Sequence, residues 1–156
     1  MKPTNPVYIS YTNDWGREDI DFIKNISEVV IDKMFDLKNY ELSILLTNDK
    51  EMKKLNKCYR SINKSTNVLS FSLKDSLKES QTTMLGDIVI AKETINTECF
   101  EQKKSFKDHL AHMFIHGFLH LTGFIHENDD DTLVMEKKEA ELLSLIGISN
   151  PYGDNL

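Results

Sequence analysis

Three histidines near the end of the chain have the clearest chemical meaning in this sequence: His116, His120 and His126. On a helix, His116 and His120 are one turn apart and can aim their ring nitrogens at one ion. Gly123 tolerates the positive φ at which helices often end, so the chain can turn there and return His126 to the same point. Three neutral imidazoles leave one position of a tetrahedral zinc ion open for water, as in catalytic sites. The spacing therefore predicts one metal ion bound by these three residues. Zn²⁺ is the expected ion, although three histidines also suit nickel, copper or cobalt.

Other sets of ligands remain open at this stage. His112 and His116 are also one turn apart, and Asp129 lies three residues beyond His126. Asp129 is more simply interpreted as the acidic start of the last helix. His109 and His112 lie on the same helical stripe as two of the predicted ligands. There they can orient a ligand or contact substrate, or they can be hydrogen-bonded residues of the core.

Gly117, directly after the first of the three histidines, limits the reaction that a metal there can support. The histidine spacing is also that of the metzincin metalloproteases, which have a glutamate at this position as general base. Without that carboxylate, a protease lacks its expected proton acceptor. Phosphodiester cleavage is less affected, because zinc lowers the pKa of a bound water to about 7 and RNA offers its own 2′-hydroxyl as a nucleophile. A zinc peptidase that obtains its base elsewhere is the runner-up.

Periodicity and capping residues indicate the elements that position these histidines. The histidine helix is apolar nearly all round, so we expect it to be buried. The order of elements predicts an α+β fold, a single domain over residues 1–156 in which helices, including a zincin-like metal helix, pack on one mixed sheet of about four strands. Strands are expected at 7–11, 40–46, 67–73 and 87–91. Helices are expected at 19–35, at 92–100, at 106–122, at 133–146 after the cap and first-turn residues 128–131, and from the cap residues 47–49 to about Cys58. Polar loops are expected at 60–66 and 74–83.

Composition narrows the class of protein further. The 156 residues are 40% hydrophobic and 28% charged, close to the average of soluble globular proteins. No run approaches the roughly 18 apolar residues of a membrane span, and the N-terminal segment lacks a secretion signal, so we expect no membrane association and a cytoplasmic location. Cys58 and Cys99 are too far apart for a zinc ribbon and are expected to be reduced. The net charge of −6 disfavours broad adhesion to nucleic acid, so any contact with RNA must be local.

Several segments resemble, in order along nearly the whole chain, the motifs of the YbeY family of ribosomal RNA maturation factors. Besides the histidine run, these segments are 55–60 (LNKCYR), similar to LN-x-x-YR; 66–71 (TNVLSF), similar to TDVLSF; 85–88 (LGDI); and Gly147 followed by 150–152 (NPY). Two positions depart from the family pattern. Asn67 stands where aspartate is usual, and Ile125 replaces an aspartate before the third histidine, which removes a carboxylate from the surroundings of the expected metal.

The resemblance implies zinc ligands at His116, His120 and His126, and a functional arginine at Arg60. It also implies a zinc-dependent endoribonuclease, specific for single strands, that acts on ribosomal RNA precursors, including the 3′ end of the small-subunit RNA, and in ribosome quality control. The implied partners are single-stranded precursor RNA and the small subunit or its assembly factors. A non-catalytic assembly factor with a structural zinc is a further alternative.

Arg60 and the lysines around it are the candidates for contact with RNA. The planar fork of Arg60 could hold a phosphate in two contacts and stabilise developing charge, with His116 as its partner in catalysis. Lys57, Lys64 and His112 are candidate substrate contacts. Lys57 and Lys64 belong to a basic stripe that is more simply a solvated helix face and the loop after it, and that also includes Lys50, Lys53 and Lys54.

Overall fold

The computed structural model describes residues 7–35, 39–73 and 83–153. In this part of the chain, strands β1 (Val7–Tyr11), β2 (Tyr40–Thr47), β3 (Val68–Ser72) and β4 (Thr83–Ala91) form one sheet in the order β1-β2-β4-β3. β1, β2 and β4 are parallel, and β3 runs antiparallel to β4 at the edge of the sheet. The mixed four-stranded sheet with helices packed on it confirms the predicted α+β fold.

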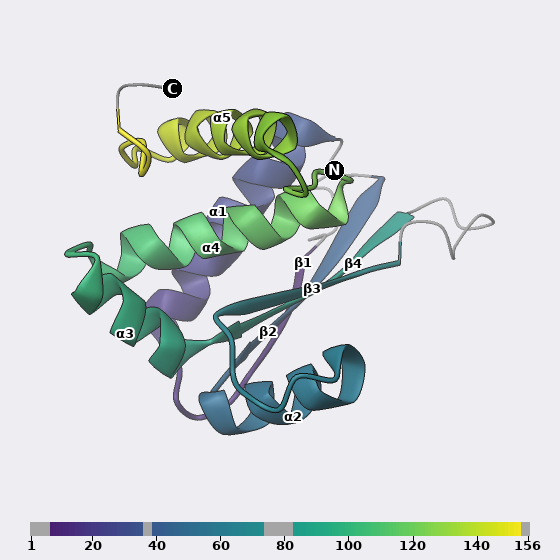
Figure 1. Cartoon of the computed structure of the whole chain (residues 1–156), viewed down its shortest axis with the longest axis vertical. Helices are drawn as coiled ribbons and strands as arrows, with labels where there is room; N and C mark the ends of the chain where they lie inside the picture. The colour runs from purple at the N-terminus through teal and green to yellow at the C-terminus, as the bar shows by residue number, and fades with distance from the viewer. Residues whose placement is uncertain (1–6, 36–38, 74–82, 154–156) are drawn as a thin grey trace, which may run out of the picture.

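The helices lie on the two faces of the sheet in unequal numbers (Figure 1). One face packs against a large core, to which β2 contributes Leu42, Ile44 and Leu46, three inward positions of a strand with period two. A smaller core lies on the opposite face. The helices around the large core are α1 (Arg17–Met34), α3 (Lys92–Glu101), α4 (Phe106–Leu121) and α5 (Asp129–Leu145), and α2 (Asp49–Arg60) packs on the other face.

β4 lies between β2 and β3, and it is buried on both faces. Ile88 and Ile90 point into the large core, whereas Val89 and Ala91 point into the small core under α2. A strand covered on both sides has a continuous apolar sequence rather than an alternating one, which explains the run DIVIA at its end. Both cores therefore meet at this strand.

α4 is the helix that positions the histidines, and it is buried on nearly every side, as its sequence predicted. Ser105 caps its N-terminus by accepting a hydrogen bond from the backbone N–H of Asp108. At the other end the chain passes Gly123, whose φ of +104° suits glycine. The buried residues of α4 are His109, Leu110, Ala111, His112, Phe114, Ile115, Gly117, Phe118, Leu119 and Leu121.

Some boundaries differ from the sequence prediction. Arg60 was expected in a loop, but it is the last residue of α2, which ends where Ser61 takes a left-handed φ of 60° and donates its N–H to carbonyls of the last turn. β4 begins at Thr83 rather than at Asp87, because its first residues pair with Tyr40 and Glu41 of β2 across a register shift. The rest of the expected loop at 74–83 lies outside the described residues.

Two expectations from composition concern the described residues directly. Cys58 is exposed and Cys99 is partly buried, and both are free thiols. Within 7–35, 39–73 and 83–153, none of the helices combines the length and apolar character that crossing a bilayer requires.

Candidate metal centre

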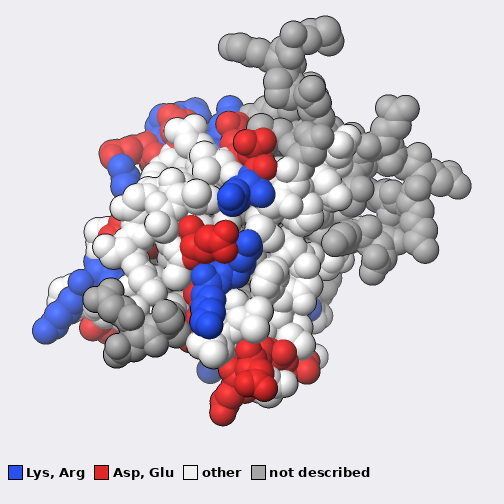
Figure 2. Space-filling model, turned by 90° about the horizontal axis from the view of Figure 1, so that it is seen from above, with Lys and Arg blue, Asp and Glu red and all other residues white. Residues whose placement is uncertain are grey.

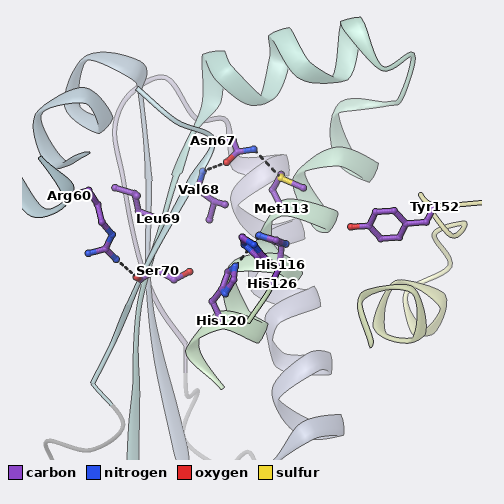
Figure 3. A pocket seen from close by; sticks show the side chains of 10 residues that line it. All are labelled: Arg60, Asn67, Val68, Leu69, Ser70, Met113, His116, His120, His126 and Tyr152. Atoms are coloured by element: carbon purple, nitrogen blue, oxygen red, sulfur yellow. Dashed lines mark hydrogen bonds between the residues drawn. The ribbon is translucent and has the colours of Figure 1, made fainter. Parts of the chain in front are cut away.

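The end of α4 and the turn after it bring the three predicted ligands together. His116 and His120 project from the last two turns of α4, and His126 lies in the loop before α5 (Figure 3). The ring centroids are 4.6 Å apart for His116 and His120, 5.5 Å for His116 and His126, and 4.8 Å for His120 and His126. One ligand nitrogen from each ring lies within 4.8 Å of the others. The three imidazoles can therefore share one metal ion.

Hydrogen bonds to acceptors fix which ring nitrogen faces the centre. Nδ1 of His116 lies 2.9 Å from Oε2 of Glu139, and Nδ1 of His120 lies 3.0 Å from the carbonyl oxygen of Phe124. Since a carboxylate and a carbonyl only accept, Nδ1 is the nitrogen that carries the proton in the neutral form of either ring. Each Nε2 then offers a lone pair to the centre.

The two Nε2 atoms of His116 and His120 are 3.1 Å apart. Two lone pairs at this distance repel unless a proton or a cation lies between them. Two nitrogens bound at about 2.0–2.1 Å to a tetrahedral zinc are about 3.3 Å apart, so the pair fits a zinc ion with little rearrangement. Burial lowers the pKa of His120, and the adjacent His116 ring lowers it further. His120 is therefore neutral at pH 7, the form that binds a metal.

Glu139 of α5 is the functional candidate that sequence reasoning missed. Its carboxylate is buried, with 1% of the side chain exposed, and Oε1 accepts hydrogen bonds from Nε2 of His112, at 2.7 Å, and from the hydroxyl of Tyr152. Burial alone would raise the pKa of Glu139, but the hydrogen bonds from two histidines and Tyr152 outweigh it and lower the pKa to about 2. Glu139 is therefore ionised at pH 7, and its carboxylate contacts His116 at Nδ1, the ring nitrogen opposite the candidate metal centre.

One signal in the sequence could have identified Glu139. Met135, Glu139, Leu142 and Leu143 recur at helical spacing and are the buried residues of α5, so a glutamate occupies a core position of an amphipathic helix. A buried carboxylate needs partners, and only the fold shows that these come from α4. Ile125, where the family's aspartate is missing, is 46% exposed and lines a separate hollow.

His112 and His109 differ from the three candidate ligands in their surroundings. His112 is buried against Glu139 and Tyr152 and does not line the cavity at the three histidines. This geometry favours a role in orienting Glu139 over a substrate contact. His109 lies on the same face of α4 but nearly two turns before His116, where its Nε2 is 2.9 Å from Oε1 of Glu98. Asp129, the other alternative ligand, is the exposed first residue of α5.

Asn67, the second departure from the family pattern, is explained by Glu98. The amide nitrogen of Asn67 donates to both carboxylate oxygens of Glu98, at 3.1 and 3.2 Å, and lies 3.2 Å from the sulfur of Met113. Its oxygen accepts from the N–H of Val68. An aspartate here would place two carboxylates in contact, so the amide suits a chain that has glutamate at position 98.

A cavity of about 620 Å³ opens beside the three histidines (Figure 3). Its wall on the side of the sheet is the edge strand β3, and Tyr152 closes another side with its hydroxyl directed toward the histidines. The cavity is therefore large enough for a phosphodiester and its neighbouring groups. The residues that line it are Arg60, Asn67, Val68, Leu69, Ser70, Met113, His116, His120, His126 and Tyr152.

Arg60 lines the same cavity from the end of α2. Its Nη2 donates to the carbonyl of Ser70 at 2.9 Å, and its guanidinium lies 4.7 Å from the centre of the Phe71 ring. The hydroxyl of Ser70 points the other way, to the Gly117 carbonyl at 2.8 Å, so Arg60 reaches β3 from the side away from α4 (Figure 3). Because a guanidinium has five N–H donors, others remain for a ligand.

The lysines proposed as substrate contacts are exposed and lie outside the cavity. Lys57 projects from α2, and Lys64 lies in the loop between α2 and β3. The other members of the basic stripe, Lys50, Lys53 and Lys54, are also exposed on α2 and outside the cavity. Their part in RNA binding stays a prediction. On the face seen from the side of α5, Lys and Arg alternate with Asp and Glu rather than forming one basic field (Figure 2). The charge distribution on this face therefore agrees with local rather than general contact with a polyanion.

Fold and site together define a class: α+β proteins with a candidate metal centre of three histidines at the end of a buried helix. A family model described as Endoribonuclease YbeY matches residues 11–147. An Endoribonuclease YbeY of Bartonella bacilliformis is 45% identical over 150 residues, covering 92% of this chain and 93% of the relative. The chain belongs to the YbeY family, which confirms the resemblance seen in the motifs.

Further relatives agree with this placement. An Endoribonuclease YbeY of Bradyrhizobium diazoefficiens is 46% identical over 123 residues, covering 76% of this chain and 67% of the relative. The solution structure of TM1509 from Thermotoga maritima superposes with a TM-score of 0.60 at 21% identity, covering 96% of this chain and 97% of that protein. At that identity the similarity establishes the fold alone.

Proposed function

We propose that this protein is a zinc-dependent endoribonuclease that cuts single-stranded ribosomal RNA precursors, including the 3′ end of the small-subunit RNA. The observation that supports this most is that the Nε2 atoms of His116 and His120 lie 3.1 Å apart with His126 beside them. They lie at the wall of a cavity that Arg60 also lines. The relatives at 45–47% identity are named as endoribonucleases. The geometry of the site and the names of the relatives therefore both favour cleavage of RNA.

The three histidines hold the metal in this proposal. A bound zinc ion would polarise a phosphodiester oxygen and lower the pKa of a bound water. Glu139 and the carbonyl of Phe124 hold the rings of His116 and His120 with Nε2 inward, which avoids reorientation when the ion binds. Tyr152 stays a neutral donor, because burial and the Glu139 carboxylate both raise its pKa.

Arg60 binds the phosphate. Its contact with the Ser70 carbonyl and its position over Phe71 restrict the guanidinium at the cavity wall, so less side-chain freedom is lost when a phosphate binds. Its remaining N–H donors can pair with two phosphate oxygens and stabilise the charge that develops during cleavage.

Gly117 argues against the alternative of a metzincin-like peptidase. A Cβ at this position would lie 2.9 Å from Oγ of Ser70 and 2.9 Å from Cγ2 of Val68. α4 and β3 are therefore too close for the glutamate that those proteases use as a base. A peptidase would need its proton acceptor from elsewhere.

The biological setting is part of the proposal. We infer a cytoplasmic enzyme that meets its RNA on the small ribosomal subunit or with its assembly factors, and that takes part in ribosome quality control. An acidic chain with a local RNA site suits a substrate presented by a particle, because it has little general attraction for RNA.

The test is cleavage of a single-stranded fragment of precursor ribosomal RNA by the zinc-loaded protein, with the same sequence as a duplex for comparison. His120→Ala and Arg60→Ala should each reduce the rate of single-strand cleavage by at least about 100-fold. Arg17→Ala is the matched control, because Arg17 is the other arginine of the chain and is exposed on α1. Equal cleavage by all four proteins would refute the mechanism.

A further inference from the structure

The face of the sheet under α2 contains a second hollow, separate from the metal cavity. α2 covers one end of this face, over Leu69, Val89 and Ala91. Where the helix ends, a groove of about 320 Å³ remains open. The residues that line the groove are Leu45, Leu55, Tyr59, Phe71, Asp87 and Val89.

Two aromatic rings form one side of this groove. Tyr59 is 60% exposed, and its ring lies edge-on to Phe71 with the centroids 5.3 Å apart. Exposed aromatic rings over an aliphatic floor are the surfaces on which proteins stack the bases of single-stranded nucleic acids. The floor here is formed by Leu45, Leu55 and Val89. The groove therefore suits a flat, largely apolar ring.

Asp87 adds one polar group to this apolar groove. It is paired in register with Phe71 on β3 and with Ser43 on β2, so its carboxylate is on the face of the sheet that α2 partly covers. Among the described residues, no donor hydrogen-bonds to that carboxylate. A half-buried carboxylate beside apolar groups gains most from a ligand that brings N–H donors.

Arg60 connects the groove with the metal cavity. Its guanidinium lines the cavity and also lies over Phe71, which lines the groove. Strand β3 is the shared wall, since Ser70 faces the histidines and Phe71 faces the groove. A phosphate bound at Arg60 thus brings the base of an adjacent nucleotide to the mouth of the groove.

We propose that this groove binds a nucleobase of single-stranded RNA and prefers guanine, beside the phosphate held by Arg60. Guanine presents two adjacent donors, N1–H and the N2 amino group, to the two oxygens of Asp87. Adenine and cytosine present one amino group, and uracil presents a single N–H between two carbonyls that the carboxylate repels. The inference rests on the proposed function for the identity of the polymer.

The experiment measures the affinity of the full chain for a short U-rich RNA with one central guanosine, inosine or uridine. Inosine is guanosine without the N2 amino group, so it tests one hydrogen bond. Fluorescence anisotropy is recorded with zinc and again with a chelator, which gives affinities in the absence of cleavage. Wild type should bind the guanosine RNA about fivefold to tenfold more tightly than the inosine RNA, and the uridine RNA least.

Three variants assign the effect to the groove. Asp87→Asn should abolish the difference between guanosine and inosine. Tyr59→Leu should lower the affinity for all three RNAs by about tenfold, because stacking does not depend on the identity of the base. Tyr11→Leu, a similarly exposed tyrosine on the opposite edge strand, should change nothing. Thermal melting of each variant establishes that it is folded.

The outcomes separate the groove from the nuclease. Equal binding of the three RNAs by wild type, or an unchanged guanosine preference in folded Asp87→Asn, would refute guanine binding in the groove even if the RNA is cut. Preferred binding of a peptide pool over RNA overturns it too. Guanosine-selective binding without cleavage supports the groove while the proposed nuclease fails.

Discussion

Oε2 of Glu139 lies 2.9 Å from Nδ1 of His116, although the two residues are on different helices and 23 positions apart in sequence. The carboxylate belongs to α5 and the ring to α4, so the packing of these helices sets the orientation of a candidate metal ligand. A carboxylate behind a ligating imidazole fixes its tautomer and raises its basicity. The orientation of the His116 ring is thus determined by the packing of α5 against α4 as well as by the local histidine motif.

Glu139→Gln should weaken zinc binding by about 10-fold to 100-fold, because the neutral amide no longer increases the basicity of His116. The measurement is a competition titration of the metal-free protein against a chromophoric zinc chelator. Glu141→Gln is the matched control, since Glu141 is an exposed residue of the same helix paired with Lys138. An unchanged zinc Kd in folded Glu139→Gln would show that the carboxylate does not support the ligand.

Gly117→Ala should lower the free energy of unfolding by about 1–2 kcal/mol, because the added Cβ overpacks the contact of α4 with Ser70 and Val68. Gly16→Ala should have an effect close to zero, since a Cβ there meets nothing within 4 Å and the stiffer unfolded chain offsets a weaker helix cap. Urea denaturation of the metal-free proteins measures both. Equal effects at the two positions would mean that the close approach of α4 to β3 is unimportant.

Asn67→Asp should destabilise the protein by about 1–2 kcal/mol, because the new carboxylate would contact that of Glu98. Adding Glu98→Gln should recover part of this loss, and the double-mutant cycle isolates the pair from the separate bond between Glu98 and His109. Additive effects in the cycle would contradict the explanation given for asparagine at this position.

The stability of the metal-free protein should fall as the pH decreases below about 6.5. Burial lowers the pKa of His109, an effect that the hydrogen bond and charge of Glu98 only partly offset, so below this pH the unfolded chain binds more protons than the folded one. Glu139 does not titrate in this range, since its pKa is about 2. His109→Gln should show a shallower decrease between pH 7 and pH 5.5 in urea denaturation, and an equal slope would exclude His109 as a cause.

The local part of the structure was predictable from the sequence, and the long-range part was not. The turn of helix between His116 and His120 and the break at Gly123 are properties of adjacent residues, so the convergence of the histidines could be anticipated. Glu139 could be recognised as a glutamate at a core position of its helix, but its role could not be assigned, because its histidine partners come from another helix. Gly117 was interpreted as a missing base, whereas the structure shows that it also permits close packing against β3.

The sheet shows the same division. Periodicity gave the strands and most of the helix boundaries, but not the order β1-β2-β4-β3, because strand pairing depends on contacts between distant segments. The position of β3 at the edge is what places Arg60 and Ser70 at the wall of the cavity. Arg60 itself was expected in a loop, since its side chain is too exposed to contribute to the helical pattern.

The proposal that His116, His120 and His126 bind one metal ion can be tested by the metal stoichiometry of the purified protein. Purified protein should bind one equivalent of zinc by elemental analysis, and cobalt substitution should give the absorption of a tetrahedral site. His120→Ala and His126→Ala should lose both signals, whereas His109→Gln should keep them. Absence of zinc from the wild type under metal-replete conditions, or full zinc content in the His120 and His126 variants, would show that these three histidines do not form a metal site.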